Sequence, residues 1–351
     1  MGGRLTVAVT IAGAVFVLTL VSIVWCGVPY GGKCRVDGVQ LLREWVTKCV
    51  PRSYSGVQKV VFVRGGMRSV WKWRVWHDAA GRSRMELIEP MLGRDSVIIS
   101  DGKTTWHVIG GGKVVIQSQD VFRAPWEVNA ERLDLLLQNY RVNALGKEEI
   151  CKRECYIVSF EPHYNFNPSR KVWLDADAYI PLKVEDYNPD GTLAWQMEYE
   201  EFSIDERISP LLFQPSISKE TKIINWGFSR KGPFRISELP TNLGFTPLLP
   251  ASLPSGYTFD KAFVIELPGW QGKPVLHLIY TDGLNVISVF ESKEAMLGEH
   301  PKPHKHGKPM QFFVPQSVVL RHVGNVRVVF ISRISKSVLE QMAQSISAPV
   351  K

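Results

Sequence analysis

Residues 56–77 read GVQKVVFVRGGMRSVWKWRVWH, and this stretch decides the fold. Two runs rich in Val, Phe and Trp, Gly56–Arg64 and Ser69–His77, flank the pair Gly65-Gly66. β-Branched and aromatic residues favour strands, and adjacent glycines accept the positive φ of a tight hairpin turn. The stretch therefore predicts an antiparallel β-hairpin.

The same alternation of apolar runs and turn residues continues outward from this hairpin. Turn residues recur at Ala80-Gly81, Asp101-Gly102 and Gly110-Gly111-Gly112. Apolar residues recur at helical spacing in Val39–Cys49 and Val128–Tyr140, which predicts two helices. Further strands are predicted at 83–89, 95–100, 104–109, 113–118, 141–149, 156–161, 170–175, 182–188 and 194–202. Sequential hairpins of this kind predict one large antiparallel sheet with covering helices over residues 36–208.

The rest of the chain predicts a second, smaller unit. Residues 209–240 are Pro-rich and lose the alternation, so we place a linker there. Residues 241–351 then predict a smaller antiparallel α+β domain. Its final helix is expected to begin at a capping box, Ser337–Glu340. Its strands are expected at 258–266, 274–281, 284–291, 310–314, 317–323 and 325–331. The fold class is α+β, and two domains agree with a length of 351 residues.

Residues 1–30 contain a membrane anchor or a signal segment. From Leu5 to Val28 the chain carries no charge, and this run is long enough to span a bilayer. A cleaved secretory signal is the alternative, but Trp25 lies where a small residue is expected before a cleavage site. We therefore expect an uncleaved single span. The basic residues Lys33, Arg35 and Arg43 follow it, so the positive-inside rule leaves a cytoplasmic orientation open.

The net charge of +8 narrows the classes of partner. No dense Lys/Arg block and no nucleic-acid-binding motif accompanies it, so we expect no nucleic-acid partner. An anionic lipid surface or an acidic partner protein accounts for a basic balance more simply. His300, His304 and His306 lie in a Pro- and Lys-rich stretch that predicts an exposed basic loop for such a surface, in preference to a metal site.

Four cysteines remain outside the apolar N-terminal run, and an even number is compatible with two disulfides in an oxidising compartment. Cys151 and Cys155 flank a predicted hairpin turn, and we expect a disulfide between them, with two free thiols as the alternative. Cys34 and Cys49 are the other possible pair.

The sequence contains no coherent catalytic constellation, so we predict a binding protein and not an enzyme. Gly110–Lys113 fails the spacing of a phosphate-binding loop. Asp175 and Asp177 fall at a predicted strand end, where Asp is favoured by turns. No cofactor and no metal ion are implied.

The aromatic residues of the first domain suggest a place for an apolar ligand. Trp71 and Trp73 share one face of their strand, because side chains alternate along a strand. One interpretation is an ordinary core, and the other is a hydrophobic cleft for acyl chains. The candidate lipid-binding residues are Trp71, Trp73, Trp106, Leu133 and Leu137.

Short motifs in a consistent order resemble the RseB/MucB family of regulators, whose first domain is similar to LolA-type lipoprotein carriers. In the first domain they are Tyr54–Gly56, Val97–His107, Gly146–Pro162, Lys171–Asp175, Ile180–Val184 and Asn188–Leu193. In the second domain they are Leu253–Tyr257, Tyr280–Leu284, Val289–Glu291 and Gly324–Ile346. The resemblance implies a LolA-like curved sheet followed by an RseB/MucB-type C-terminal domain.

The resemblance also implies a function. Such proteins lie outside the cytoplasmic membrane, bind the extracytoplasmic segment of an anti-sigma factor and shield it from proteolysis. Their first domain is thought to sense lipid or lipoprotein acyl chains, which weakens that binding and so controls an envelope-stress sigma factor. The alternative is a membrane-anchored lipid or lipoprotein carrier of LolA type. An uncleaved anchor departs from the soluble members, and it predicts a single-span protein of the cytoplasmic membrane with extracytoplasmic domains.

Overall fold

The structure is a computed structural model, and it describes residues 37–48, 51–88, 95–118, 128–204, 207–225, 229–266, 274–293 and 317–346. Residues Val36–Lys351 form one compact unit, to which all of these belong. The predicted anchor, Cys34, Cys49, the three histidines near residue 300 and the strand predicted at 310–314 lie outside the described residues. No helix among the described residues is long and apolar enough to cross a membrane.

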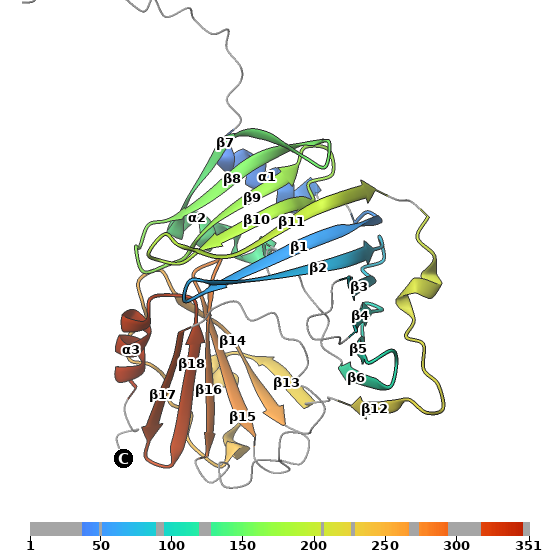
Figure 1. Cartoon of the computed structure of the whole chain (residues 1–351). Helices are drawn as coiled ribbons and strands as arrows, with labels where there is room; N and C mark the ends of the chain where they lie inside the picture. Colours follow the sequence, from blue (N-terminus) through green and yellow to red (C-terminus); the bar gives the residue numbers. More distant parts are fainter. Residues whose placement is uncertain are drawn as a thin grey trace, which may run out of the picture. The chain divides into compact units, whose positions relative to one another are not determined.

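The larger sheet has twelve strands in the order β12-β6-β5-β4-β3-β2-β1-β11-β10-β9-β8-β7, and it curves strongly without closing (Figure 1). Neighbouring strands are antiparallel, except that β12 runs parallel to β6. The strands are β1 (Tyr54–Arg64), β2 (Met67–His77), β3 (Ser83–Leu87), β4 (Ser96–Ser100), β5 (Thr105–Ile109), β6 (Val114–Ser118), β7 (Tyr140–Ile150), β8 (Arg153–Pro162), β9 (Ser169–Asp175), β10 (Pro181–Tyr187), β11 (Leu193–Ile204) and β12 (Lys222–Asn225).

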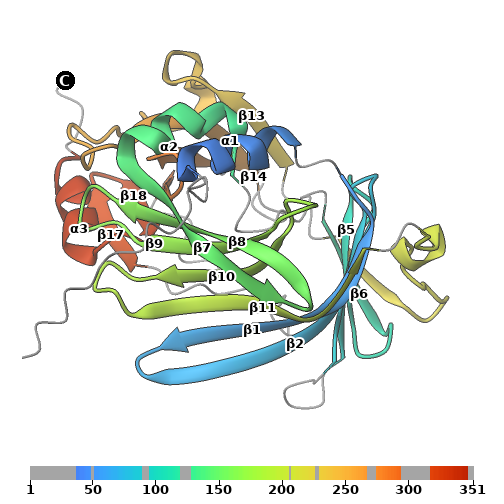
Figure 2. The ribbon, with the colours of Figure 1, turned by 90° about the horizontal axis from the view of Figure 1, so that it is seen from above.

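Two helices cover one face of this sheet (Figure 2). Helix α1 (Gly38–Lys48) packs on β7 and β8, and α2 (Leu133–Asn139) packs on β7. Leu41, Leu42 and Trp45 of α1 are buried, because the apolar stripe predicted from helical spacing faces the sheet. They share one core with the inward side chains of the strands, including Phe160 and Trp73.

The smaller sheet has six antiparallel strands in the order β13-β14-β15-β16-β18-β17. They are β13 (Ser229–Phe234), β14 (Thr258–Glu266), β15 (Val275–Thr281), β16 (Val286–Lys293), β17 (Ser317–Val323) and β18 (Val326–Ser332). Helix α3 (Lys336–Gln344) packs on β17 and β18 and buries Leu339, Met342 and Ala343. The predicted α+β class, a large curved antiparallel sheet with covering helices followed by a smaller antiparallel sheet, is confirmed.

Two sequence predictions on element boundaries are wrong. Helix α3 begins at Lys336 with Ser335 at its N-cap, so Ser337 lies inside the first turn and forms no capping box. The chain between 128 and 140 is a 3-10 turn (Ala130–Arg132) followed by the short α2, and Tyr140 already belongs to β7. The stretch 209–240 contains β12 and β13, while the predicted division into domains stays a prediction.

Candidate functional site

The turn between β15 and β16 docks the smaller sheet onto the larger one through buried polar contacts. The Tyr140 hydroxyl, at the start of β7, donates to Asp282 Oδ2 at 2.6 Å and accepts from Asn285 Nδ2 at 2.6 Å. The backbone N–H groups of Leu284 and Asn285 donate to Asp282 Oδ1. Because an unpaired polar group in a protein interior is costly, a network in which each member has a partner fixes how this turn sits.

A second group of hydrogen bonds strengthens this docking. Asn139, the last residue of α2, donates from Nδ2 to the carbonyl oxygens of Gly256 at 2.9 Å and Asp282 at 3.0 Å. The Tyr257 hydroxyl donates to Asn167 Oδ1 at 3.1 Å. The motifs Leu253–Tyr257 and Tyr280–Leu284, on which the resemblance of the second domain partly rests, are therefore among the segments that make contacts across the junction.

A buried ionic cluster forms the other part of the junction. The Asp186 carboxylate, on β10, accepts Nε and Nη2 of Arg170 at 2.6 and 2.9 Å and Nε1 of Trp195 at 2.8 Å. Nη1 of Arg333, which follows β18 in the smaller sheet, also donates to this carboxylate. Two cations thus share one anion, and the ion pair between Arg333 and Asp186 joins the two sheets.

The pKa values at the junction follow from burial and neighbouring charges. Burial alone would raise the pKa of Asp186, but the guanidinium groups of Arg170 and Arg333 outweigh it and hold that pKa below its usual value. Burial raises the pKa of Asp282, although Tyr140 and two backbone N–H groups oppose the rise. Burial and the Asp282 carboxyl raise the pKa of the Tyr140 hydroxyl well above its usual value.

A cavity of about 410 Å³ opens beside the ionic cluster. Arg170, Asp186 and Arg333 contribute its charged wall, and Leu284, Phe290 and Ile331 contribute much of its apolar wall. Clefts of this size with a few polar groups among apolar side chains are usual ligand sites. The junction between the sheets is therefore the candidate binding site.

The predicted lipid-binding residues lie elsewhere. Trp73 is completely buried, and Trp71, Leu133 and Leu137 pack against the same core. The ring centroids of Trp71 and Trp73 are 6.3 Å apart. Trp106, on β5, is half-buried and does not belong to this cluster. Four of the five residues thus come together, and their role in lipid binding stays a prediction.

The predicted disulfide between Cys151 and Cys155 is absent, and both residues are free thiols. Cys151 lies in the two-residue turn between β7 and β8 at φ 52° and donates from Sγ to the Tyr199 carbonyl at 3.1 Å. Cys155 lies on β8 with its side chain buried in the core, so the turn directs the two thiols to different surroundings. Burial raises the pKa of the Cys155 thiol to about 12.

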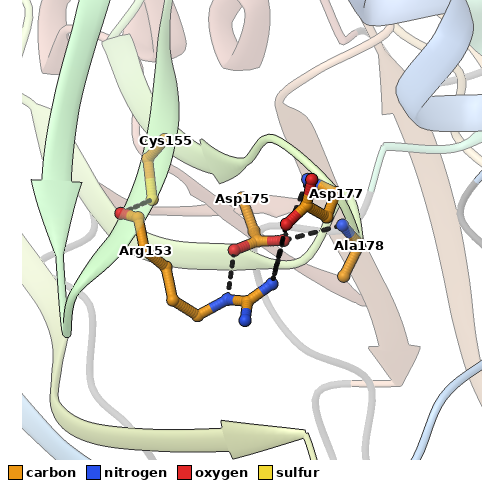
Figure 3. Close-up of polar contacts among 5 residues, drawn as sticks. All are labelled: Arg153, Cys155, Asp175, Asp177 and Ala178. Atoms are coloured by element: carbon orange, nitrogen blue, oxygen red, sulfur yellow. Dashed lines mark hydrogen bonds and ion pairs between the residues drawn. The ribbon is translucent and has the colours of Figure 1, made fainter.

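Asp175 and Asp177 form part of a structural turn (Figure 3). Asp175 pairs with the Arg153 guanidinium and accepts the backbone N–H groups of Asp177 at 3.1 Å and Ala178 at 2.7 Å. Nη2 of Arg153 lies 3.5 Å from the Asp177 carboxylate. These contacts fix the chain as it turns from β9 towards β10.

The charged residues of the junction were not singled out from the sequence. Arg170 and Asp186 lie in strands that contain other charged residues, Lys171 and Glu185 among them, so nothing in the sequence marked them as buried partners. Arg170 and Asp186 are opposite one another on β9 and β10, whereas the pairing of Arg333 with Asp186 depends on how the two sheets meet, which the alternation of a strand does not encode.

The architecture defines a class of α+β proteins in which one chain forms two sheets, with a candidate ligand site at the junction between them. Residues 43–217 match the model of the MucB/RseB N-terminal domain. The chain belongs to the MucB/RseB family.

Solved structures of MucB share this fold. The MucA/MucB complex of Pseudomonas aeruginosa has a TM-score of 0.59 at 20% identity, covering 90% of this chain and 100% of that chain. A structure of MucB in complex with MucA(peri) has a TM-score of 0.57 at 20% identity, with the same coverage. MucB alone has a TM-score of 0.53 at 17% identity, covering 88% and 97%. The search of curated proteins found no match.

Proposed function

We propose that this protein is an extracytoplasmic regulator that binds the exposed segment of a transmembrane anti-sigma factor. The observation that carries the proposal is that the chain matches the whole length of MucB in a structure of the MucA/MucB complex. Membership of the MucB/RseB family supports the same kind of partner. Binding would shield the anti-sigma factor from proteolysis and so control an envelope-stress sigma factor.

The proposal places the chain at the cytoplasmic membrane. The uncharged run Leu5–Val28 would be a single span, with the two sheets on the extracytoplasmic side. A fixed position beside a single-span partner raises the effective concentration of one for the other. Such an anchor also favours a sensor that stays in place over a carrier that travels.

Lipid sensing is the finer part of the proposal, and helix α2 supports it. Leu133 and Leu137 of α2 pack against the core that contains Trp71 and Trp73. Asn139, at the end of the same helix, bonds to the smaller sheet. An acyl chain that displaced these apolar side chains would move α2 and thereby weaken the junction, which couples the two sites.

Co-purification from native membranes tests the main proposal. Affinity-tagged full-length protein, captured after mild solubilisation, should retain a single-span membrane protein that mass spectrometry identifies as an anti-sigma factor. The control is residues 1–35 fused to an unrelated folded protein, which should retain no such partner. Recovery of the bait alone, or of the same proteins with the control, contradicts the proposal.

A membrane-anchored lipid or lipoprotein carrier is the second candidate, favoured by the open curved sheet with half-buried Trp71 on its core side. A fluorescent acyl probe should bind the full-length protein in either case. In the regulator, lipid should release the co-purified partner. In a carrier, bound lipid should be transferred to acceptor vesicles with no effect on a partner.

A further inference from the structure

Arg333 leaves one edge of its guanidinium without a hydrogen-bond partner. Its Nη1 donates to Asp186, whereas Nε and Nη2 are buried and unpaired. The Nε–H and Nη2–H bonds run side by side, which is the geometry that holds both oxygens of a carboxylate. Arg170 uses the same two nitrogens to hold Asp186. Arg333 therefore has an equivalent, buried edge whose two donors are without a carboxylate partner.

The unused edge belongs to a side chain that lines the 410 Å³ cavity. The charged groups on the cavity wall are Arg170, Arg333 and Asp186, two cations and one anion. Asp282 lies near this wall, but three donors already satisfy its carboxylate. Buried donors without partners are unfavourable, so a carboxylate that reaches Arg333 would supply the hydrogen-bond acceptors that the unbound protein lacks.

An apolar surface continues from the cavity across the smaller sheet. Phe290 and Ile331 line the cavity and also face outward in two cross-strand rows. Phe290 pairs with Val329, which pairs with Leu320, and Ile331 pairs with Val318. Val318 and Leu320, on the outermost described strand β17, are 55% and 49% exposed. Side chains of this size exposed in rows are a usual sign of an interaction surface.

The charge around these rows is positive. The next row along the same strands contains Arg327 and His322, and Arg333 lies at the opposite end. The three rows that cross β16, β18 and β17 contain no Asp or Glu. They are Ser288–Ile331–Val318, Phe290–Val329–Leu320 and Ser292–Arg327–His322. The surface therefore complements a ligand that is acidic and apolar.

We propose that these three rows together with the cavity, here called the 318–333 face, bind an extended polypeptide segment that is acidic and apolar, with one Asp or Glu carboxylate held by Arg333. This inference rests on the proposed function, since the segment would belong to the anti-sigma partner. Rows that lie two residues apart along a strand are about 6.8 Å apart, which is also the spacing of side chains on one face of an extended peptide. A lone acyl chain prefers an enclosed apolar cavity to a half-exposed sheet face.

Two labelled peptides and three variants of the full-length protein test the proposal. One fluorescein-labelled, end-blocked octapeptide of Leu, Val and Ser carries a central Asp, and the other carries Asn instead. Fluorescence anisotropy should show about 10-fold tighter binding of the Asp peptide to the wild-type protein. R333K keeps a cation near Asp186 but lacks the paired donors, and it should abolish this preference.

The remaining variants separate contact from folding. L320S changes an exposed side chain and should weaken the binding of both peptides by a similar factor, without altering the melting temperature of the protein. R68K changes an exposed arginine on β2 and should leave both affinities unchanged. Equal affinities of wild-type and R333K proteins for the Asp peptide overturn the proposal. A second outcome also overturns it: the wild-type protein shows no preference between the peptides, and R333K loses binding to phosphatidylglycerol vesicles. That outcome would indicate that Arg333 binds a lipid headgroup.

Capture from native membranes distinguishes a failure of the proposed contact at Arg333 from a failure of the proposed function. If wild-type protein and R333K retain the partner equally, the inference fails while the proposed function stands. If the wild-type protein retains no partner, the proposed function fails, and the peptide measurements still decide whether the 318–333 face binds acidic segments.

Discussion

Among single residues, Glu291 on β16 is a carboxyl group enclosed in the core of the smaller sheet. Its side chain is completely buried, Oε2 accepts the Leu248 N–H at 3.0 Å, and Oε1 has no partner. Burial raises its pKa from 4.5 to about 8. An acid with a raised pKa stabilises the fold while protonated, and that stability is lost as the pH rises through about 8.

We therefore expect the free energy of unfolding to fall by about 2 kcal/mol between pH 6.5 and pH 9 through this group. E291Q keeps an acceptor for Leu248 without the charge, so the fall should disappear. Denaturant unfolding at both pH values measures it, with E340Q on the exposed face of α3 as the control. Burial lowers the pKa values of His107 and His277 to about 4, so these groups change the free energy of unfolding mainly below pH 6.5. Parallel pH profiles for wild-type protein and E291Q would contradict the assignment.

Among the elements, the β15–β16 turn depends on a close approach to α2 that only glycine permits. Gly283 has φ +99°, and a Cβ there would lie 2.3 Å from the backbone nitrogen of Leu136. G283A should destabilise the protein by about 3 kcal/mol, since it adds a clash with backbone to an unfavourable φ. The matched control is G324A in the β17–β18 turn, where φ is +60° and no atom lies within 4 Å.

G324A should cost about 1 kcal/mol, because it carries the backbone strain alone. Denaturant unfolding of both variants measures the difference. Equal losses would mean that the turn does not need its contact with α2.

The elements also show how far the sequence predicts the structure. The hairpin of β1 and β2 follows from two runs rich in β-branched and aromatic residues and from Gly65-Gly66, and the strands predicted at 274–281 and 284–291 leave Asp282-Gly283 for the turn between β15 and β16. The pairing of β12 with β6 was not predicted, because it joins distant and weakly patterned segments. The contacts of Arg170, Asp186 and Arg333 were missed for a similar reason, since each charge is explained only by a partner from another strand.

At the scale of the whole molecule, the junction makes the two sheets one compact unit. Asn139 contributes strongly to the stability of this junction, since its side-chain amide donates hydrogen bonds to the carbonyl groups of Gly256 and Asp282. N139A leaves both carbonyls buried without this donor, at about 1–3 kcal/mol for each unpaired group. Because this cost falls on the junction and not on either core, the variant should separate the unfolding of the two sheets.

Differential scanning calorimetry of the full-length protein tests the coupling. We expect one transition for the wild-type protein and two for N139A. N188A, which removes a hydrogen bond to Thr192 within an exposed turn, should keep one transition. A single transition for N139A, merely shifted to lower temperature, would show that the ionic cluster of Asp186 suffices to hold the sheets together. In that case a lipid signal passing through α2 could not release a partner by loosening the junction, and the sensing step would have to act at Arg333 itself.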